Sequence, residues 1–156
     1  MNGELKIYYK SGSYFSGLTN KNQVKGAGQI RYQNRDTFEG IIENSKKNGL
    51  GRYVFAQEKC TYDGVFHQDQ INGPGRVKYS NGDTFEGEFV NGLKHGIGKY
   101  TYKNGDVYEG SWENDKKNGK GLYIYFSGEI YSGEWVDDLK QGQGRIDFAD
   151  MSMYQG

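Results

Sequence analysis

The sequence predicts an all-β fold: an elongated, single-layer antiparallel meander of tandem β-hairpins with a 23-residue period. Three observations support this prediction. An aromatic residue followed two positions later by glycine recurs along the whole chain, and a Gly-x-Gly pair comes eleven residues after nearly every such aromatic. Within each period, the aromatic residues and glycines alternate with polar residues, and this period of two is typical of strands.

The aromatic-x-Gly motif sets the register of the repeats. Its spacing is 23 residues throughout, apart from a single interval of 24 whose extra residue lies within residues 56–60. The occurrences are Phe15/Gly17, Phe38/Gly40, Tyr62/Gly64, Phe85/Gly87, Tyr108/Gly110, Tyr131/Gly133 and Tyr154/Gly156. We therefore interpret residues 1–156 as a single array of about six full repeats with partial units at both ends.

Each repeat is expected to contain two strands, as residues 96–102 and 106–112 illustrate. Gly96, Gly98, Tyr100 and Tyr102 share one face of the first strand, whereas the intervening residues point to the other face. A glycine beside an aromatic column leaves room for the ring of a neighbouring strand to lie over the backbone. We expect the rings to supply the buried area and the glycines to supply the space.

Two kinds of connector join the strands. Asn104-Gly105 and Asn81-Gly82 predict type I′ hairpins, in which both residues have positive φ. The other connector is the polar stretch between the second strand and the next Gly-x-Gly pair. Its turn position is occupied by Asn22, Ser45, Asp69, Gly92, Asp115 and Asp138, most of which tolerate turn geometry.

Aromatic residues on the glycine-bearing face form two columns. The first column is Tyr32, Phe55, Tyr79, Tyr102, Tyr125 and Phe148, and the second is Phe38, Tyr62, Phe85, Tyr108 and Tyr131. Rings with polar tips along a sheet can receive a helix or an extended peptide. We predict that the first column is a partner-binding groove, with mutual burial of neighbouring rings as its alternative, and that the second column serves packing.

A carboxylate recurs once per repeat near the hairpin loop, at Asp36, Asp83, Asp106 and Glu129, and Cys60 takes the same position in one repeat. Regular recurrence favours hydrogen bonding at the loops over acid-base chemistry. The Gly-x-Gly pairs lie within strands, so they are not phosphate-binding loops. We predict no catalytic, cofactor-binding or metal-binding residue, and no enzyme.

Composition excludes several partners and compartments. Twenty basic and twenty acidic residues are interspersed without a basic block, which argues against nucleic acid as a partner. A single cysteine cannot form an internal disulfide, and neither a signal peptide nor a long apolar span is present. The expected location is cytoplasmic.

The repeat resembles the MORN (membrane occupation and recognition nexus) family, whose pattern runs Y-x-G-x-W-x-x-G-x-x-x-G-x-G. Residues 85–98, FEGEFVNGLKHGIG, match every glycine of that pattern and carry an aromatic at both ring positions. The resemblance implies a non-enzymatic scaffold or adaptor for protein-protein interactions, within a ciliary, axonemal or cytoskeletal assembly. The expected partner is a protein, bound in the aromatic groove or by end-to-end self-association. The alternative is a membrane- or phosphoinositide-targeting module of a larger signalling enzyme.

Overall fold

The structure, a computed structural model, describes residues 3–8, 10, 12–20 and 23–156. The chain divides into two compact units, Met1–Ser80 and Asn81–Gly156, which we describe separately. In the described part of both units the regular secondary structure consists of strands, and it includes no helix that could cross a membrane.

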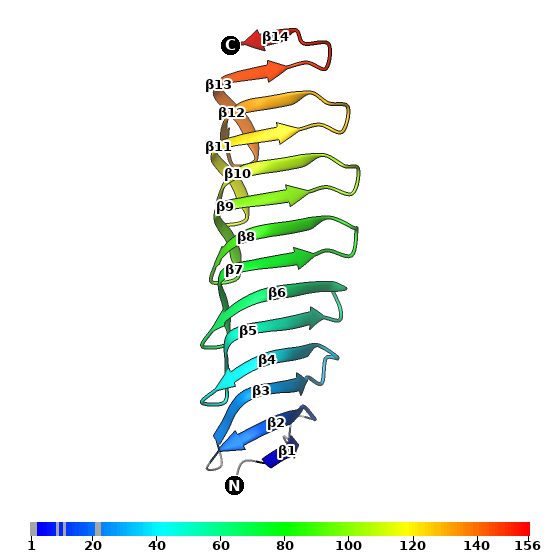
Figure 1. Cartoon of the computed structure of the whole chain (residues 1–156), viewed down its shortest axis with the longest axis vertical. Helices are drawn as coiled ribbons and strands as arrows, with labels where there is room; N and C mark the ends of the chain where they lie inside the picture. Colours follow the sequence, from blue (N-terminus) through cyan, green and yellow to red (C-terminus); the bar gives the residue numbers. More distant parts are fainter. Residues whose placement is uncertain (1–2, 9, 11, 21–22) are drawn as a thin grey trace. The chain divides into compact units, whose positions relative to one another are not determined.

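The N-terminal unit contains seven strands among its described residues. Each strand pairs antiparallel with the strand that follows it in sequence, so the chain runs as a meander (Figure 1). The strands are β1 (Gly3–Tyr8), β2 (Tyr14–Asn20), β3 (Gln23–Arg31), β4 (Thr37–Glu43), β5 (Lys46–Phe55), β6 (Cys60–His67) and β7 (Gln70–Lys78).

The C-terminal unit repeats this arrangement. Its strands also pair antiparallel in sequence order. They are β8 (Thr84–Val90), β9 (Leu93–Thr101), β10 (Val107–Glu113), β11 (Lys116–Ile124), β12 (Ile130–Val136), β13 (Leu139–Asp147) and β14 (Met153–Gln155). The predicted meander of antiparallel hairpins is confirmed in both units.

The second aromatic column forms the core of each unit. Phe38, Tyr62, Phe85 and Tyr108 are at most 1% exposed, and Tyr131 is 6% exposed. The side of the sheet that carries these rings is called the aromatic face below. Four of these rings meet the next buried aromatic residue of the repeat edge to face, as Tyr108 meets Trp112 with ring centroids 5.2 Å apart. The expectation that the second column serves packing is confirmed.

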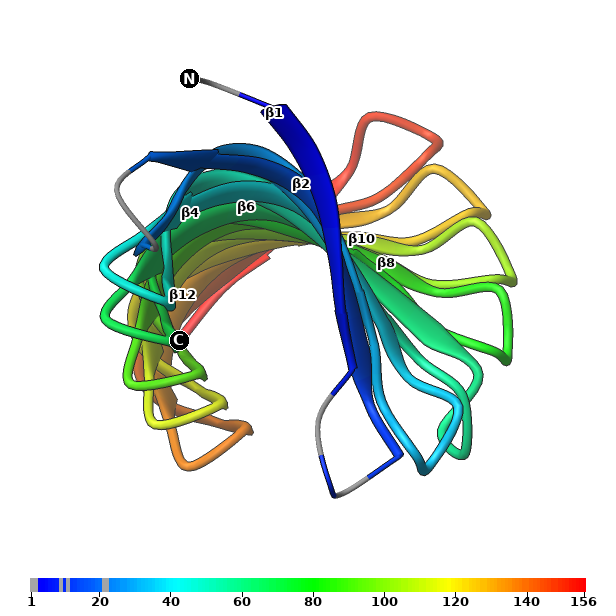
Figure 2. The ribbon, with the colours of Figure 1, turned by 90° about the horizontal axis from the view of Figure 1, so that it is seen from below.

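Two glycines per repeat provide the space that these rings need. A Cβ on Gly121 would lie 2.5 Å from Cε2 of Tyr108, and a Cβ on Gly110 would lie 2.5 Å from the Cα of Gly121. Ring and backbone therefore occupy the volume of the missing side chains, as predicted. The first glycine of each Gly-x-Gly pair has a different role, because Gly49 and Gly119 have φ of 112° and 95°, beside a register shift in the pairing of their strands. The strands bend between their two loop-bearing ends (Figure 2).

The prediction of type I′ turns at Asn-Gly was wrong. In the loop 103–105, Gly105 has a φ of 94° but Asn104 does not have a positive φ, and the Gly105 N–H donates to the Tyr102 carbonyl at 2.9 Å. This is a three-residue hairpin loop that ends in a left-handed residue. The Asn104 side chain stabilises this loop, because its Oδ1 accepts a hydrogen bond from the Asp106 N–H at 3.0 Å.

Consecutive positive φ values, the mark of type I′ turns, occur instead in the other connector. Asn114 and Asp115 have φ of 49° and 71°, and Asn44 and Ser45 have φ of 51° and 63°. The expected turn position is confirmed at Ser45, Asp69, Gly92, Asp115 and Asp138, whereas Asn22 lies outside the described residues. The turn itself takes only two residues, so the strands extend further into the polar stretch than the sequence suggested.

Candidate functional site

Each residue of the first aromatic column directly precedes a hairpin loop, which has three residues after Tyr102 and four after Phe55. The backbone N–H of Tyr102 donates to the Asp106 carbonyl, and that of Tyr125 to the Glu129 carbonyl, both at 2.9 Å. In the N-terminal unit the column residues Tyr32, Phe55 and Tyr79 are half-buried. In the C-terminal unit Tyr102 and Tyr125 are half-buried and Phe148 is 40% exposed. The column is therefore accessible, in contrast to the fully buried second column.

A third set of rings links successive members of the first column. In the C-terminal unit the ring centroids of Tyr102 and Tyr123 are 5.8 Å apart, and those of Tyr123 and Tyr125 are 4.7 Å apart. In the N-terminal unit Tyr53 lies in the same way between Tyr32, at 5.7 Å, and Phe55, at 4.4 Å. Within each unit these linking rings extend the apolar surface of the first column. The sequence analysis had not included the linking rings in the site.

The recurring aspartates hold the linking tyrosines in place. Tyr100 donates its hydroxyl hydrogen to Asp83 Oδ2 at 2.7 Å, and the Lys103 N–H donates to Asp83 Oδ1 at 2.8 Å. Asp106 accepts equivalent bonds from Tyr123 and from the Phe126 N–H, both at 2.9 Å. The predicted role of these carboxylates in hydrogen bonding near the loops is confirmed, and each connects one hairpin loop to the next.

These hydrogen bonds also set the ionisation of the carboxylates. Burial alone would raise the pKa of Asp83, but the bonds from Tyr100, Lys103 and Asn81 outweigh it, and the pKa is lowered from its usual value. The N–H of Phe126 is the largest cause of the lowered pKa of Asp106. Both carboxylates therefore stay ionised at neutral pH. Conversely, burial raises the pKa of Tyr108 to about 12, so that hydroxyl stays protonated.

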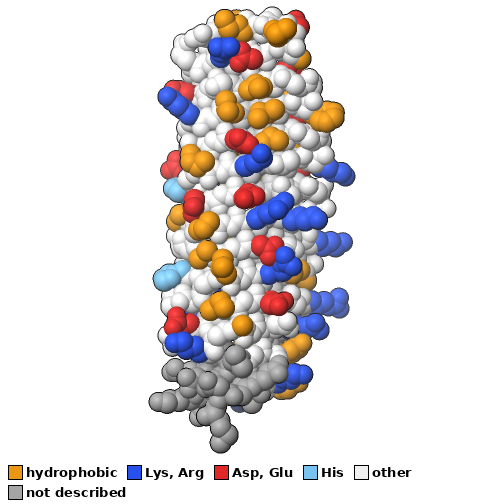
Figure 3. Space-filling view, in the orientation of Figure 1, with side chains coloured by type: hydrophobic (Ala, Val, Ile, Leu, Met, Phe, Trp, Pro, Cys, Tyr) orange, Lys and Arg blue, Asp and Glu red, His pale blue; other side chains and the backbone are white. Residues whose placement is uncertain are grey.

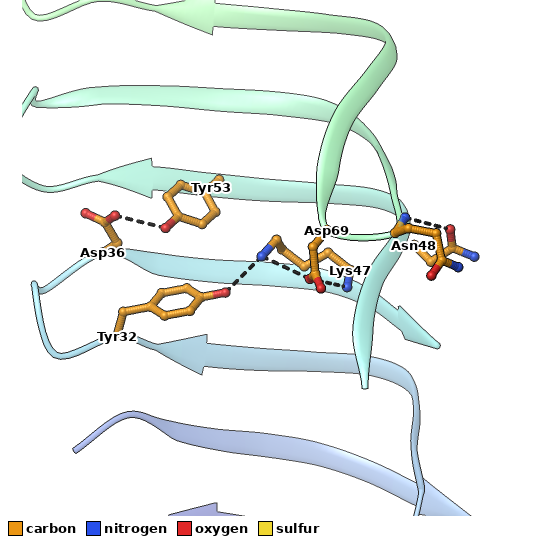
Figure 4. A network of polar contacts seen from close by, with 7 residues as sticks. Tyr32, Asp36, Lys47, Asn48, Tyr53 and Asp69 are labelled. Carbon is orange, nitrogen blue, oxygen red and sulfur yellow. Dashed lines mark hydrogen bonds and ion pairs between the residues drawn. The ribbon is translucent and has the colours of Figure 1, made fainter. Parts of the chain in front are cut away.

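A lysine from the same position of four repeats also lies on the aromatic face, and the sequence analysis missed it. In the N-terminal unit, Lys47 Nζ donates to the Tyr32 hydroxyl at 3.1 Å and pairs with Asp69 Oδ1 at 3.2 Å (Figure 4). The ammonium also lies 5.5 to 5.8 Å from the centroids of Tyr32, Phe38 and Tyr53. Its side chain is only 12% exposed.

The C-terminal unit has three such lysines. Lys94 Nζ lies 5.1 Å from the Trp112 centroid and 3.6 Å from Asp115 Oδ1. Lys117 Nζ lies 4.9 Å from the Trp135 centroid. Lys140 Nζ donates to the Tyr125 hydroxyl at 2.6 Å and lies 4.3 Å from the Tyr131 centroid. Cations thus recur at a fixed position among the rings, within reach of the first column.

The type I′ turns connect neighbouring repeats at the opposite end of the strands. Asp115 Oδ1 accepts a hydrogen bond from the Lys94 N–H at 3.0 Å, and the Asp115 N–H donates to the Lys94 carbonyl at 3.1 Å. Asp138 makes the same pair of bonds with the backbone of Lys117. Lys94 and Lys117 are therefore fixed at the backbone, while their ammonium groups lie over the rings.

Neither the cysteine nor the metal-ligating side chains indicate a catalytic or metal site in the described part of the chain. Cys60 begins β6, and burial, with smaller contributions from Glu58 and Asp36, raises the pKa of its thiol, so the thiol stays protonated. Within the described residues there is no cluster of three or more metal-ligating side chains. The face turned to the viewer in Figure 3 carries acidic, basic and apolar side chains intermingled.

Comparison with known proteins decides the family. The sequence pattern of the MORN repeat matches residues 38–57, 62–84, 85–107, 108–130 and 131–150, which together make up more than half of the chain. The chain belongs to the MORN repeat family. The matched repeats include all the lysines of the aromatic face and most of the first column. No match was found among curated protein sequences.

Two solved structures share the fold of this MORN protein. The TCP domain of SAS-4 (dCPAP) of Drosophila melanogaster, in complex with a proline-rich motif of Ana2 (dSTIL), aligns with a TM-score of 0.63 and 14% identity, over 99% of this chain and 88% of that chain. The TCP10c domain of Drosophila melanogaster Sas-4 aligns with a TM-score of 0.58 and 14% identity, over 99% and 98% of the two chains. At this identity the likeness concerns the fold alone.

Proposed function

We propose that this MORN array is a non-enzymatic interaction scaffold that holds an extended segment of a partner protein against the first aromatic column. The observation that carries the proposal is the half-exposed surface formed by the first column and its linking rings. Flat rings with hydroxyl tips offer apolar contact and hydrogen bonds together, which is the composition of peptide-recognition surfaces.

The comparison with SAS-4 supports an extended peptide over a helix. That domain, which shares this fold, is in complex with a proline-rich motif of Ana2. A proline-rich segment is already extended in solution, so it loses little conformational entropy when it binds. By its resemblance to other MORN proteins, we place the scaffold in a cytoplasmic cytoskeletal or ciliary assembly. End-to-end self-association stays the second mode of assembly in this proposal.

A peptide selection tests the proposal directly. Extended and proline-rich peptides displayed on phage are selected against the folded protein, and the affinity of the best peptide is measured by calorimetry. We expect Tyr102→Ala/Tyr125→Ala to weaken binding at least about tenfold, because aromatic anchors dominate such interfaces.

The matched control changes two apolar side chains on the opposite face, Ile97→Ala/Leu122→Ala, which are 69% and 40% exposed. The control should bind as the wild type does, with circular dichroism showing that all variants are folded. Equal affinity of the tyrosine variant and the wild type would mean that the first column is not a recognition surface.

A cavity in the N-terminal unit favours a second candidate function, contact with a phosphoinositide headgroup. The cavity has a volume of about 550 Å³, and its lining includes Arg31, Arg35 and Tyr32 but no Asp or Glu. Among the described residues neither guanidinium has an ion-pair partner, and Arg31 lies 5.8 Å from the Tyr14 ring centroid. Unpaired arginines in a concave site are suited to phosphate.

Liposome co-sedimentation tests this second candidate. Vesicles of phosphatidylcholine with a few per cent of a bisphosphorylated phosphoinositide should retain the wild type and lose Arg31→Gln/Arg35→Gln. Lys46→Gln/Lys59→Gln removes the same charge elsewhere on the unit and should be retained. If the vesicles retain both variants equally, any binding comes from general charge attraction, and the headgroup site is contradicted.

A further inference from the structure

We propose that the aromatic face of the C-terminal unit recognises an acidic, proline-rich segment through two carboxylates spaced three residues apart, one bound by Lys117 and the other by Lys140. The inference rests on the proposed function and specifies the chemistry of its partner. Three observations carry it: the ion pairing of the lysines, their spacing, and the rings between them.

The first observation is that two of the lysines form no ion pair with a carboxylate of the described residues. Lys94 has Asp115 at 3.6 Å, and in the other unit Lys47 has Asp69 at 3.2 Å. Among the described residues no carboxylate lies within ion-pair distance of Lys117 Nζ or Lys140 Nζ. Two ammonium groups on a largely apolar ring surface attract an anionic partner, because charge-assisted hydrogen bonds are stronger than neutral ones.

The accessibility of the two lysines fits this role. Lys117 is half-buried, whereas Lys140 is exposed and lines a cavity of about 270 Å³ together with Tyr131, Ile146 and Tyr154. The Lys140 ammonium makes its hydrogen bond with Tyr125, a neutral hydroxyl, and so keeps two hydrogens for other acceptors. A carboxylate can therefore bind without displacing an existing ion pair.

The second observation is that the spacing of the two lysines across the sheet matches one turn of a polyproline II peptide. Lys117 lies on β11 and Lys140 on β13, two strands apart, which corresponds to about 9.6 Å across the sheet. A polyproline II helix has three residues per turn and advances about 9.3 Å in that turn. Residues i and i+3 of such a peptide therefore face the same side at nearly the separation of the two lysines.

The third observation is what lies between the two cations. The rings of Tyr123 and Tyr125 occupy the interval, with centroids 4.7 Å apart. Lys117 Nζ is 5.4 Å and Lys140 Nζ 6.0 Å from the Tyr123 centroid, so the same ring lies next to both charges. Proline rings at positions i+1 and i+2 would lie against this aromatic surface, as proline-rich peptides do in aromatic-lined sites.

Synthetic peptides of eight residues test the register. The first has the sequence Pro-Pro-Glu-Pro-Pro-Glu-Pro-Pro, the second contains the same residues with the two glutamates two positions apart, and the third has glutamine in place of glutamate. Affinities for the full chain are measured by fluorescence anisotropy at 50 and 300 mM NaCl. We expect the first peptide to bind at least about fivefold more tightly than the second and about tenfold more tightly than the third.

Matched variants assign the effect to the two lysines. Lys117→Gln/Lys140→Gln should reduce the affinity for the first peptide to that of the glutamine peptide. Lys116→Gln/Lys120→Gln, which removes two exposed charges from β11, should not change it beyond about twofold. The preference of the wild type for the first peptide should also shrink at 300 mM NaCl, a readout that does not depend on how stable the variants are.

The outcomes separate this inference from the proposed function. If the three peptides bind equally, and Tyr102→Ala/Tyr125→Ala abolishes the binding, the carboxylate register is wrong while the scaffold proposal stands. If none binds, whereas the phage selection yields peptides that need Tyr102 and Tyr125, the acidic proline-rich class is wrong. Tighter binding of an alanine-based helix with glutamates seven positions apart would also overturn the inference, because that spacing reaches about 10.5 Å on a helix.

Discussion

The two aromatic columns have almost the same composition and lie on the same face, yet their environments differ. Tyr108 of the second column is fully buried, whereas Tyr102 of the first column is half-exposed. The difference lies in their neighbours. Tyr108 folds over Gly110 and Gly121, which have no side chains, whereas Tyr102 precedes a loop and packs against the rings of Tyr100 and Tyr123. Glycine placement, and not ring chemistry, decides which tyrosines form the core.

The largest expected difference in stability is between two variants, each of which loses one ring from one of the columns. Tyr108→Ala should lower the free energy of unfolding by about 3–5 kcal/mol, because it leaves a large cavity in the core. Tyr102→Ala should lower it by less, about 1–2 kcal/mol, since this ring is only partly buried and its removal opens no enclosed cavity. Urea unfolding followed by tryptophan fluorescence measures both, and Trp112 and Trp135 restrict the signal to the C-terminal unit. Equal costs would show that the two columns do not differ in packing.

A glycine substitution tests the reason for the difference. Gly110→Ala should destabilise the C-terminal unit by about 1–3 kcal/mol, because its Cβ would lie 2.5 Å from Gly121 Cα and 2.7 Å from the Lys120 carbonyl oxygen. The control is Gly92→Asn. Gly92 has a φ of 83°, which asparagine tolerates, and nothing lies within 4 Å of its added Cβ. The control should stay within about 0.5 kcal/mol of wild type in the same urea assay.

The smallest effect concerns the aspartates that support the linking tyrosines. Asp83→Ala should cost about 1–2 kcal/mol at pH 7, where its carboxylate accepts three side-chain and backbone bonds. The folded-state pKa of Asp83 is lowered, so this stabilisation is present above the unfolded pKa of about 3.9 and is lost as the pH falls through the folded value.

Unfolding curves at pH 7 and pH 3 test the sign of this effect. The difference in the free energy of unfolding between the wild type and Asp83→Ala should be smaller at pH 3 than at pH 7. Glu86→Gln, an exposed carboxylate of the opposite face, should show no comparable change. If this difference in the free energy of unfolding is the same at both pH values, the ionised carboxylate does not stabilise the fold.

Much of the fold could be predicted from the sequence because the repeat encodes it many times. The 23-residue spacing places Tyr62, Phe85 and Tyr108 in one column, and the structure buries all three. The recurrence of Asp36, Asp83 and Asp106 beside the loops likewise predicted their hydrogen bonds. A single strand can be misassigned from its own residues, but a pattern that recurs at the same spacing in every repeat identifies the strand.

Features that depend on backbone conformation could not be predicted in this way. Asn104-Gly105 has the composition of a type I′ turn, but the Asn104 side chain bonds Asp106 and a three-residue loop results. The lysines of the aromatic face were missed for a related reason. The whole stretch between Trp112 and Gly119 was interpreted as a connector, whereas β11 begins at Lys116 and its alternation places Lys117 on the aromatic face. The recurrence of Lys94, Lys117 and Lys140 every 23 residues was the available signal.

Within each unit the described strands pair with the strands that neighbour them in sequence, and this local pairing has consequences for folding and evolution. Contacts between near neighbours close short loops, which favours fast folding and lets structure grow from any hairpin. The same pairing means that a 23-residue insertion or deletion changes the number of ring and lysine positions without disturbing those that remain. Duplication or deletion of one repeat would therefore lengthen or shorten the peptide that we propose for such an array, by about one turn of polyproline II helix.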